Sequence, residues 1–405
     1  MAGESRRQWQ RRFRRDGNSE GAVGDFTPAL EKGHWGHWRR WMESAKTMSI
    51  HNEPLVSVVT PVYNGASYLK ECIESVLAQT YSNWEYIIVN NCSTDETLQI
   101  AEEYGRKEKR IQVHSNDRFL DVIANHNRAF RLISPHGKYC KQVSADDWLF
   151  PECLTHMVTL AETNPSVGIV GSYQLSGDVV KWQGFRYPRA VVPGREMGRR
   201  IFLARQVSVE GQPLLGFGTP TSLMYRADLV RSRAEFYPNS SPHADTSACF
   251  ANLQNSDFGF VYEILSYERT HAESQTYASR QVNRHLSQTL SDLQLYGSSY
   301  LSKQEMERQL NETLTGYRRF LAVNYFVGFR DKEFWDYHKG RLAELGYPLS
   351  HLTLLKAAVL TVLQESVNPG EAIGKLWRHL FPARGEGAGE TAQAGAAVKE
   401  TLARG

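Results

Sequence analysis

The chain has 405 residues, and its 47 Lys and Arg against 44 Asp and Glu leave a formal net charge of +3. With 41% hydrophobic and 11% aromatic residues the composition is globular, which excludes wholesale disorder, and the length suits two domains or one large domain with an appendage. The near-neutral charge balance argues against a dedicated nucleic-acid-binding protein, because such domains are strongly basic.

The five cysteines are scattered, odd in number and without a Cys-x-x-Cys pair, so neither a disulfide framework nor a zinc module is indicated; they are Cys72, Cys92, Cys140, Cys153 and Cys249. No apolar segment follows the basic first residues, which argues against a secretory signal. The apolar run from Leu352 to Leu363 contains Lys356 and is too short to span a bilayer. We expect a cytoplasmic protein that is soluble or rests peripherally on the cytoplasmic membrane face.

Residues 1–53 form a basic arm that carries four of the nine tryptophans. Two interpretations of this arm stay open: it is partly disordered and packs through its tryptophans, or it docks on a membrane or a partner through basic and aromatic side chains. At the other end, residues 384–405 are rich in Gly, Ala and Glu, which predicts a disordered tail.

From Pro54 onward, short apolar runs alternate with stretches of helical periodicity. The apolar runs predict buried strands at 55–63, 84–89, 111–114, 139–143 and 167–171. Between them we expect four helices. The first starts with a cap at Ser67 and the second with a capping box at Ser93–Glu96. The third starts near residue 121 and the fourth at Pro151. The alternation predicts a doubly wound, mostly parallel α/β sheet over 54–274, and the polar periodicity of 275–383 predicts a helical C-terminal region.

Polar or aromatic side chains follow three of these strands, at the end where such sheets bind ligands. Tyr63-Asn64-Gly65 offers a flat ring and a turn, and the cluster from Asn90 to Asp95 offers hydrogen-bonding groups at a helix start. The adjacent carboxylates of Asp146 and Asp147 repel each other, which a divalent cation such as Mg²⁺ or Mn²⁺ relieves. Taken singly, an Asp-Asp pair is more often a helix cap, and a Pro-x-Tyr-Asn motif is usually a turn. The presence of all three groups, the Tyr63 turn, the Asn90–Asp95 cluster and the Asp146-Asp147 pair, at predicted strand ends favours a binding site.

Residues 57–98 resemble the nucleotide-binding half of the family 2 glycosyltransferases, with their GT-A fold. Residues 75–80 (Ser-Val-Leu-Ala-Gln-Thr) match one of the family's motifs throughout, and the resemblance extends over about 54–272. It implies an enzyme that binds a nucleoside-diphosphate sugar across these loops, with a divalent cation on the diphosphate and a later carboxylate as the base.

The resemblance implies roles for individual residues on the donor side. Asn90 stands where the family usually has the aspartate that accepts the uracil N3–H; its amide oxygen can still accept that bond, so UDP is favoured, while its NH₂ could serve another base. The other positions implied to contact the donor in this half of the chain are Pro61, Tyr63, Asn64, Ser93 and Asn127.

The acidic motif departs from the family pattern, because Ser144 replaces the first aspartate of Asp-x-Asp-Asp. By position, Asp146 is implied to be the metal ligand, whereas Asp147 orients it or contacts neighbouring groups. One carboxylate fewer predicts modest metal affinity.

The acceptor half is less regular. Asp245 falls where these transferases place the catalytic base, although a helix N-cap has a similar sequence signature, and the two roles are compatible. Arg269 and His271 resemble a closing motif that approaches the diphosphate and metal, which makes His271 a second metal or phosphate contact or, alternatively, a structural histidine. The segment 216–221 (Gly-Phe-Gly-Thr-Pro-Thr) lacks the third glycine of a dinucleotide loop and is expected near the acceptor.

These assignments predict an inverting transfer of a sugar to a hydroxyl of a glycan, lipid-linked or other acceptor, with Asp245 as general base. Two other functions stay open. A sugar nucleotidyltransferase uses a related fold but usually carries a basic, Gly-rich loop after the first strand, which this chain lacks. A non-catalytic nucleotide-sugar-binding relative would explain the substitutions at Asn90 and Ser144.

Overall fold

The computed structural model describes residues 53–181, 189–204, 216–238, 243–269, 283–327 and 332–365. The basic arm up to residue 52, the predicted tail at 384–405 and His271 lie outside these ranges. Within them the predicted α/β domain is confirmed.

A ten-stranded mixed sheet forms the centre of the described α/β domain, in the order β3-β2-β1-β4-β9-β6-β10-β5, with β7 paired to β6 and β8 to β10. Strands β1, β2, β3 and β4 are mutually parallel, as are β6 and β10, whereas β9 runs antiparallel between β4 and β6. The strands are β1 Val56–Val62, β2 Trp84–Asn90, β3 Ile111–Ser115, β4 Tyr139–Gln142, β5 Trp148–Leu149, β6 Val167–Ser176, β7 Val179–Lys181, β8 Val191–Val192, β9 Leu223–Arg226 and β10 Asp257–Glu268.

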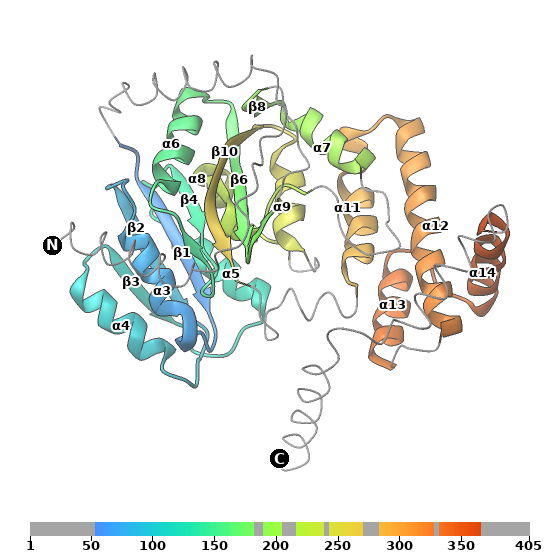
Figure 1. Ribbon diagram of the computed structural model, residues 1–405, viewed down its shortest axis with the longest axis horizontal. Helices are drawn as coiled ribbons and strands as arrows, with labels where there is room; N and C mark the ends of the chain where they lie inside the picture. Colours follow the sequence, from blue (N-terminus) through green and yellow to red (C-terminus); the bar gives the residue numbers. More distant parts are fainter. Residues whose placement is uncertain are drawn as a thin grey trace, which may run out of the picture. The chain divides into compact units, whose positions relative to one another are not determined.

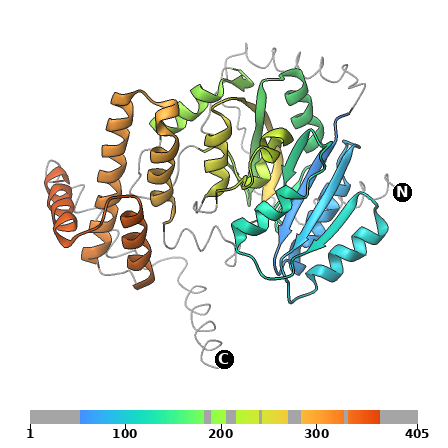
Figure 2. The same ribbon diagram turned by 180° about the vertical axis from the view of Figure 1, so that it is seen from behind.

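Helices cover both faces of the sheet (Figures 1 and 2). Helices α3, α4 and α6 pack on one face, and α5, α7, α8, α9 and α11 on the other. Side chains alternate along each strand, so that Val58 joins the first layer and Val59 the second. The helices of this domain are α3 Ala66–Leu77, α4 Thr97–Lys107, α5 Val122–Arg131, α6 Cys153–Thr163, α7 Gly194–Ala204, the 3₁₀ helix η1 Pro220–Ser222, α8 Ala227–Arg231, α9 Ala244–Asn252 and α11 His285–Tyr300.

Two predicted helix caps are wrong. Helix α3 starts from Gly65 without a side-chain cap, which places Ser67 inside the helix. Helix α4 starts only at Thr97, and the hydroxyl of Ser93 accepts a hydrogen bond from the backbone of Asn64 instead of capping the helix. The side chain of Asp95 takes the capping role, since its Oδ1 accepts from the Thr97 amide at 3.1 Å.

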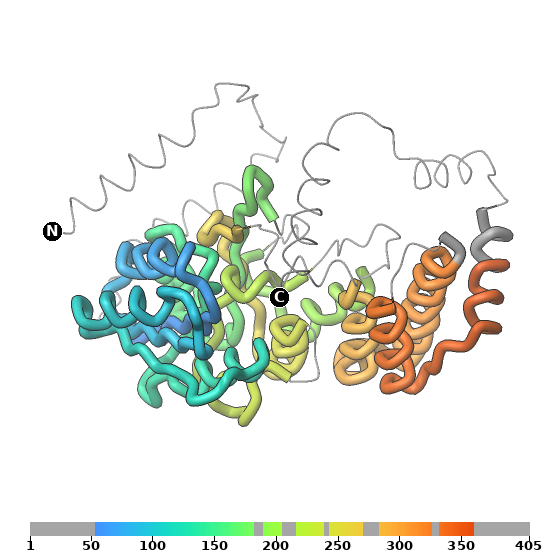
Figure 3. The backbone as a smooth tube through the Cα atoms, turned by 90° about the horizontal axis from the view of Figure 1, so that it is seen from below, coloured from blue at the N-terminus to red at the C-terminus, as the bar shows by residue number. Residues whose placement is uncertain are grey.

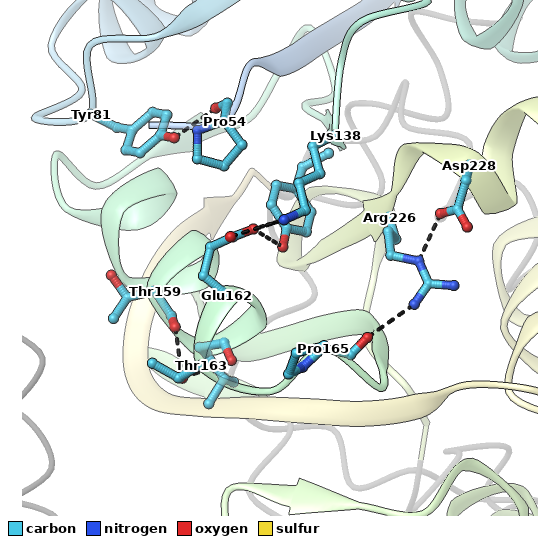
Figure 4. Close-up of polar contacts among 11 residues, drawn as sticks. Pro54, Tyr81, Lys138, Thr159, Glu162, Thr163, Pro165, Arg226 and Asp228 are labelled. Carbon is cyan, nitrogen blue, oxygen red and sulfur yellow. Dashed lines mark hydrogen bonds and ion pairs between the residues drawn. The ribbon is translucent and has the colours of Figure 1, made fainter. Parts of the chain in front are cut away.

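Side-chain contacts tie the layers together at the amino ends of β1 and β4, opposite the predicted site (Figure 4). Glu162 on α6 accepts from Lys138 at 2.9 Å and from the Tyr139 hydroxyl at 2.6 Å. On the neighbouring strand, Arg226 pairs with Asp228 at 2.7 Å and donates to the carbonyl of Pro165 at 3.2 Å. This end is therefore occupied by internal structural bonds.

The chain divides into two compact units, Met1–Leu314 and Thr315–Gly405. Within the first unit, helix α11 packs on α7 and α9. The helices that follow α11 are α12 Lys303–Val327, α13 Lys332–Glu344 and α14 His351–Glu365 (orange to red in Figure 3). Among the described helices, none combines the length and apolar character that crossing a bilayer requires.

Candidate donor-binding site

The turns that follow β1 and β2 are hydrogen-bonded to each other. The side-chain oxygen of Asn64, a residue with φ of +48°, accepts from the Thr94 amide at 2.8 Å, and the Asn64 amide donates to the Ser93 hydroxyl at 3.0 Å. Just inside these turns, the Asn91 amide donates to the Val62 carbonyl at 2.8 Å. Asparagine tolerates the left-handed conformation better than most residues, which explains its place at this tight turn.

Asp95 adds a second connection between the same two turns. Its Oδ2 accepts from the Ala66 amide at 3.1 Å, while the Thr97 hydroxyl accepts from the Gly65 amide at 2.8 Å. Burial tends to raise the pKa of Asp95, but the hydrogen bonds from Thr97 and Ala66 outweigh it and leave the pKa below its usual value. The charged form is therefore the one that holds these turns together.

The loop after β4 lies against the first turn. The Thr60 hydroxyl donates to the Val143 carbonyl at 2.8 Å, and the Cys72 thiol lies 3.4 Å from the Ser144 carbonyl. A Cβ added to Gly65 would lie 3.5 Å from the Cβ of Ala145. The three predicted loops thus meet at the carboxyl ends of β1, β2 and β4.

The two carboxylates of the acidic motif have different environments. Asp146 is half-buried, whereas Asp147 is buried and both of its oxygens are bonded: one accepts from the Thr221 hydroxyl at 2.6 Å and the other from the Arg269 amide at 3.0 Å. Burial, and after it the Asp146 carboxylate, raise the pKa of Asp147 well above its usual value. Asp147 therefore supports the loop from within, and Asp146 is the less buried of the two carboxylates.

Arg269 clamps this loop from the end of β10. Its guanidinium donates to the Asp146 carbonyl at 3.2 Å and pairs with Glu71 on α3. The guanidinium carbon lies 4.5 Å from the Tyr68 ring centre and 5.2 Å from that of Trp148, within the range of cation–π contact. These contacts use Arg269 inside the protein, so its predicted role at the diphosphate stays a prediction, as does the role of His271.

An exposed aromatic pair stands beside the first turn. Tyr63 and Phe119 are 49% and 59% exposed, and their ring centroids lie 4.9 Å apart in an edge-to-face arrangement. Large exposed rings that are not part of a core offer stacking faces to a base. The sequence analysis missed Phe119, although an aromatic residue soon after the third predicted strand was a usable signal.

Two of the predicted asparagines, Asn90 and Asn127, are buried and hydrogen-bonded. The side-chain oxygen of Asn90 accepts from the Ser93 amide at 3.2 Å, and its side-chain nitrogen donates to the Ser115 hydroxyl at 3.4 Å, so a base contact by Asn90 stays a prediction. Asn127 uses both ends of its amide on the Tyr237 backbone, at 2.9 and 2.7 Å. The contacts of Asn127 are therefore structural, and a donor contact there stays a prediction. Pro61 lies within β1 and is paired in register with Val89 of β2.

Asp245 lies in the first turn of α9, two residues after the N-cap position at His243. Its charge contributes to the raised pKa values of the buried Tyr225 and Tyr237, for which burial is the largest cause. The alternative interpretation of Asp245 as the N-cap itself is wrong by two positions. The helix is anchored behind it, since Ser247 donates to the buried Asp292 of α11 at 2.6 Å.

A divalent cation would find few protein ligands here. Within the described residues no group of three or more His, Cys, Asp or Glu side chains could hold a metal ion. Both oxygens of Asp147 accept hydrogen bonds from the protein, and the role of Asp146 as a metal ligand stays a prediction. Mg²⁺ commonly takes one or two carboxylates together with substrate phosphates and water, so the residues fit a cation that is held jointly with a diphosphate.

Comparison with known proteins agrees with this geometry. Residues 57–233 match the model of glycosyl transferase family 2. An uncharacterized glycosyltransferase of Haemophilus influenzae is 40% identical over 124 residues, which cover 31% of this chain and 38% of that protein. One from Rickettsia bellii is 38% identical over 236 residues, which cover 57% of this chain and 32% of that protein. The chain thus spans only about a third of the length of these relatives.

A solved structure shares the fold. The crystal structure of S. aureus TarS 1–349 in complex with UDP-GlcNAc aligns with a TM-score of 0.52 at 17% sequence identity, covering 72% of this chain and 80% of that one. Residues 57–233 are thus similar to glycosyl transferase family 2, and the α/β domain has the GT-A fold.

Proposed function

We propose that the protein transfers a sugar from a nucleoside-diphosphate sugar to an acceptor hydroxyl with inversion at the anomeric carbon. The observation that carries this proposal is the junction of three loops at the carboxyl ends of β1, β2 and β4 within the family 2 region. In open α/β sheets this edge is where ligands bind.

The donor is proposed to lie across these loops with its base beside Tyr63 and Phe119. The side-chain oxygen of Asn90 supports a uracil base, whose N3–H it can accept. Asp146 faces the diphosphate, where a bound divalent cation supplies charge neutralisation for the leaving group. TarS, which shares the fold, binds UDP-GlcNAc, and this supports a UDP-linked donor.

Asp245 is proposed to act as the general base. It takes the proton of the acceptor hydroxyl while the hydroxyl oxygen bonds to the anomeric carbon and the bond from that carbon to the phosphate oxygen breaks. The nucleoside diphosphate leaves with the bonding electrons, and no covalent enzyme intermediate forms. Attack from the side opposite the leaving group inverts the anomeric centre.

The direct test is turnover of a panel of nucleotide sugars, measured as released nucleoside diphosphate. UDP-sugars should be turned over preferentially, and Asp245→Asn should lower turnover at least 10³-fold with nucleotide affinity unchanged. The matched control is Asp228→Asn, an exposed acidic residue on α8 paired with Arg226. Near wild-type turnover of Asp245→Asn would place the base elsewhere.

The two alternative functions give other results in the same assay. A sugar nucleotidyltransferase would consume a nucleoside triphosphate and release pyrophosphate. A non-catalytic relative would bind a nucleotide in calorimetry without releasing any product.

The acceptor is proposed to be a hydroxyl of a glycan or lipid-linked glycan. Helix α14 exposes Leu352, Leu355 and Val359 along one side, which agrees with peripheral membrane contact through this helix. These residues give no information on the predicted role of the basic arm. Flotation of the whole chain with anionic liposomes, compared with Leu352→Gln and Leu355→Gln variants, tests this contact.

A further inference from the structure

The segment at 216–223, part of which the sequence analysis expected near the acceptor, is hydrogen-bonded to the acidic loop. Its 3₁₀ helix η1 places the buried hydroxyl of Thr221 between two atoms of that loop. The hydroxyl donates to Asp147 at 2.6 Å and accepts from the Ser144 amide at 3.1 Å. One threonine thus fixes both the backbone and the carboxylate of the motif.

Thr221 is itself held by a buried lysine on the central strand β4. The ammonium group of Lys141 donates to the Thr221 carbonyl and to the Leu223 carbonyl, the latter at 3.0 Å. Lys141 has no exposed surface, and its burial lowers the pKa of its side chain. Burying a charged lysine side chain away from water costs free energy unless its ammonium group is fully hydrogen-bonded or paired. The presence of Lys141 within the buried strand β4 therefore calls for an explanation.

The geometry points to Lys141 and Thr221 as positioning residues for the Asp146–Asp147 pair. This inference rests on the proposed function, since it assigns the pair the task of meeting the donor diphosphate. Lys141 fixes the Thr221 backbone, Thr221 fixes the Asp147 carboxylate, and Asp147 holds the loop from which Asp146 faces the ligand.

Two neighbouring features agree with a rigid support. Gly218 has φ of +145°, a conformation that L residues rarely adopt, and a Cβ there would lie 2.4 Å from the Ser222 hydroxyl. The Ser222 hydroxyl accepts from the Thr219 amide at 2.8 Å. The tight turn before η1 therefore sets where Thr221 stands.

Variants at Thr221 separate positioning from folding. Thr221→Val keeps the size and shape of the side chain but removes the hydroxyl, whereas Thr221→Ser keeps the hydroxyl. The matched control is Thr219→Val on the same segment, because the Thr219 hydroxyl donates to Gln174 and not to the acidic loop. Lys141→Met removes the ammonium group at similar length.

The measurements are kcat and KM for the nucleotide sugar that the wild type turns over best, together with Mn²⁺ titration followed by the paramagnetic resonance signal of free Mn²⁺. We expect Thr221→Val and Lys141→Met to lower kcat at least tenfold and to weaken Mn²⁺ binding in the presence of UDP at least fivefold. Thr221→Ser and Thr219→Val should stay within threefold of wild type. Thermal melting monitored by circular dichroism verifies that each variant is folded.

If Thr221→Val and Thr221→Ser have the same kcat, KM and Mn²⁺ affinity, the inference is overturned, whether those shared values are close to wild type or reduced. If Lys141→Met does not fold, the comparison of Thr221→Val with Thr221→Ser alone tests the inference. A wild type that turns over no nucleotide sugar would contradict the proposed function instead, and in that case Mn²⁺ binding still compares the two Thr221 variants. The two failures are therefore distinguishable.

Discussion

Gly65 stands where β1 passes into α3, and it lies beside Thr97 and Ala145, which belong to the other two loops. A Cβ at this position would lie 2.6 Å from Cγ2 of Val62, which is a forbidden approach to a buried strand residue. Any side chain here must therefore displace Val62 or shift the first turn.

Gly65→Ala should destabilise the protein by about 1–3 kcal/mol, as overpacking of a tight site does, and should weaken nucleotide binding. Gly340→Ala on α13 is the matched control, since a Cβ there meets nothing within 4 Å and alanine favours a helix by about 1 kcal/mol. Urea denaturation and calorimetry with UDP measure both effects. Unchanged affinity in a destabilised Gly65→Ala protein would separate this turn from the binding site.

Asp95 gives the same turns a dependence on pH. Its folded pKa is below the usual value, so its contribution is present above about pH 4, the pKa expected in the unfolded chain, and is lost as pH falls through the folded pKa. Asp95→Ala should cost about 1 kcal/mol at pH 7, as lost helix caps do, and the difference from wild type should shrink below pH 4.

Unfolding in urea at pH 7, 5 and 3.5 checks this dependence on pH. Asp121→Ala removes the cap of α5, where Asp121 accepts from the Ala124 amide at 2.9 Å, and serves as a control for cap loss that does not bridge the two turns. If the difference in free energy of unfolding between Asp95→Ala and wild type grows as the pH falls, the predicted direction of the pH dependence is contradicted.

Residues within one motif were largely predictable from the sequence, whereas residues whose role depends on a distant partner were not. The positions of Tyr63, Asn64 and Asp146 at strand ends follow from the alternation of strands and helices. The cap at Ser67 and the capping box at Ser93 were wrong because Gly65 packs against a strand and Ser93 bonds Asn64, 29 residues away. No local pattern reveals that Thr221 bonds to Asp147.

Helices α9 and α11 form a locked pair behind the proposed base. The Oδ1 of the buried Asp292 on α11 accepts from Ser247 on α9 at 2.6 Å and from Gln288 at 2.7 Å. Gln288 also donates to the Ser247 hydroxyl at 2.7 Å. Because Asp245 lies two residues before Ser247, this cluster fixes the helix turn that carries it.

Asp292→Ala should lower the free energy of unfolding by at least about 2 kcal/mol, because it leaves two buried donors without their acceptor. Asp292→Asn keeps an oxygen at the same place and should recover most of that loss. Urea denaturation measures stability, and kcat of the folded variants measures the effect on the proposed base. Equal stabilities of the alanine and asparagine variants would show that the bonds to Oδ1 contribute little.

Elements with their own periodicity were predicted well. Strands β1 to β4 were expected within one residue of their observed bounds, because each is a buried run, whereas β6 starts where expected but extends to Ser176 instead of residue 171. The position of β9 could not be predicted, since a strand of Leu223–Arg226 is too short to show its pattern and runs antiparallel between parallel neighbours. That insertion is what brings Thr221 beside the acidic loop.

At the scale of the whole molecule, the two faces of the sheet have separate apolar layers, and the two ends of the strands have separate tasks. The amino ends carry ion pairs and carbonyl contacts such as those of Glu162 and Arg226. The carboxyl ends carry the joined loops, with a buried lysine beneath them. The proposed site therefore lies at the edge where α/β sheets generally bind ligands, away from these internal bonds.

The account's central claim is that the loops at 60–66, 90–97 and 144–147 form one binding surface. Amide hydrogen exchange of the whole chain, measured with and without the nucleotide sugar it turns over and with Mn²⁺, tests it most directly. The account predicts that ligand slows exchange in all three loops together and leaves the amino ends of β1 and β4 unchanged. Slower exchange in one loop alone, or protection confined to another region, would contradict it.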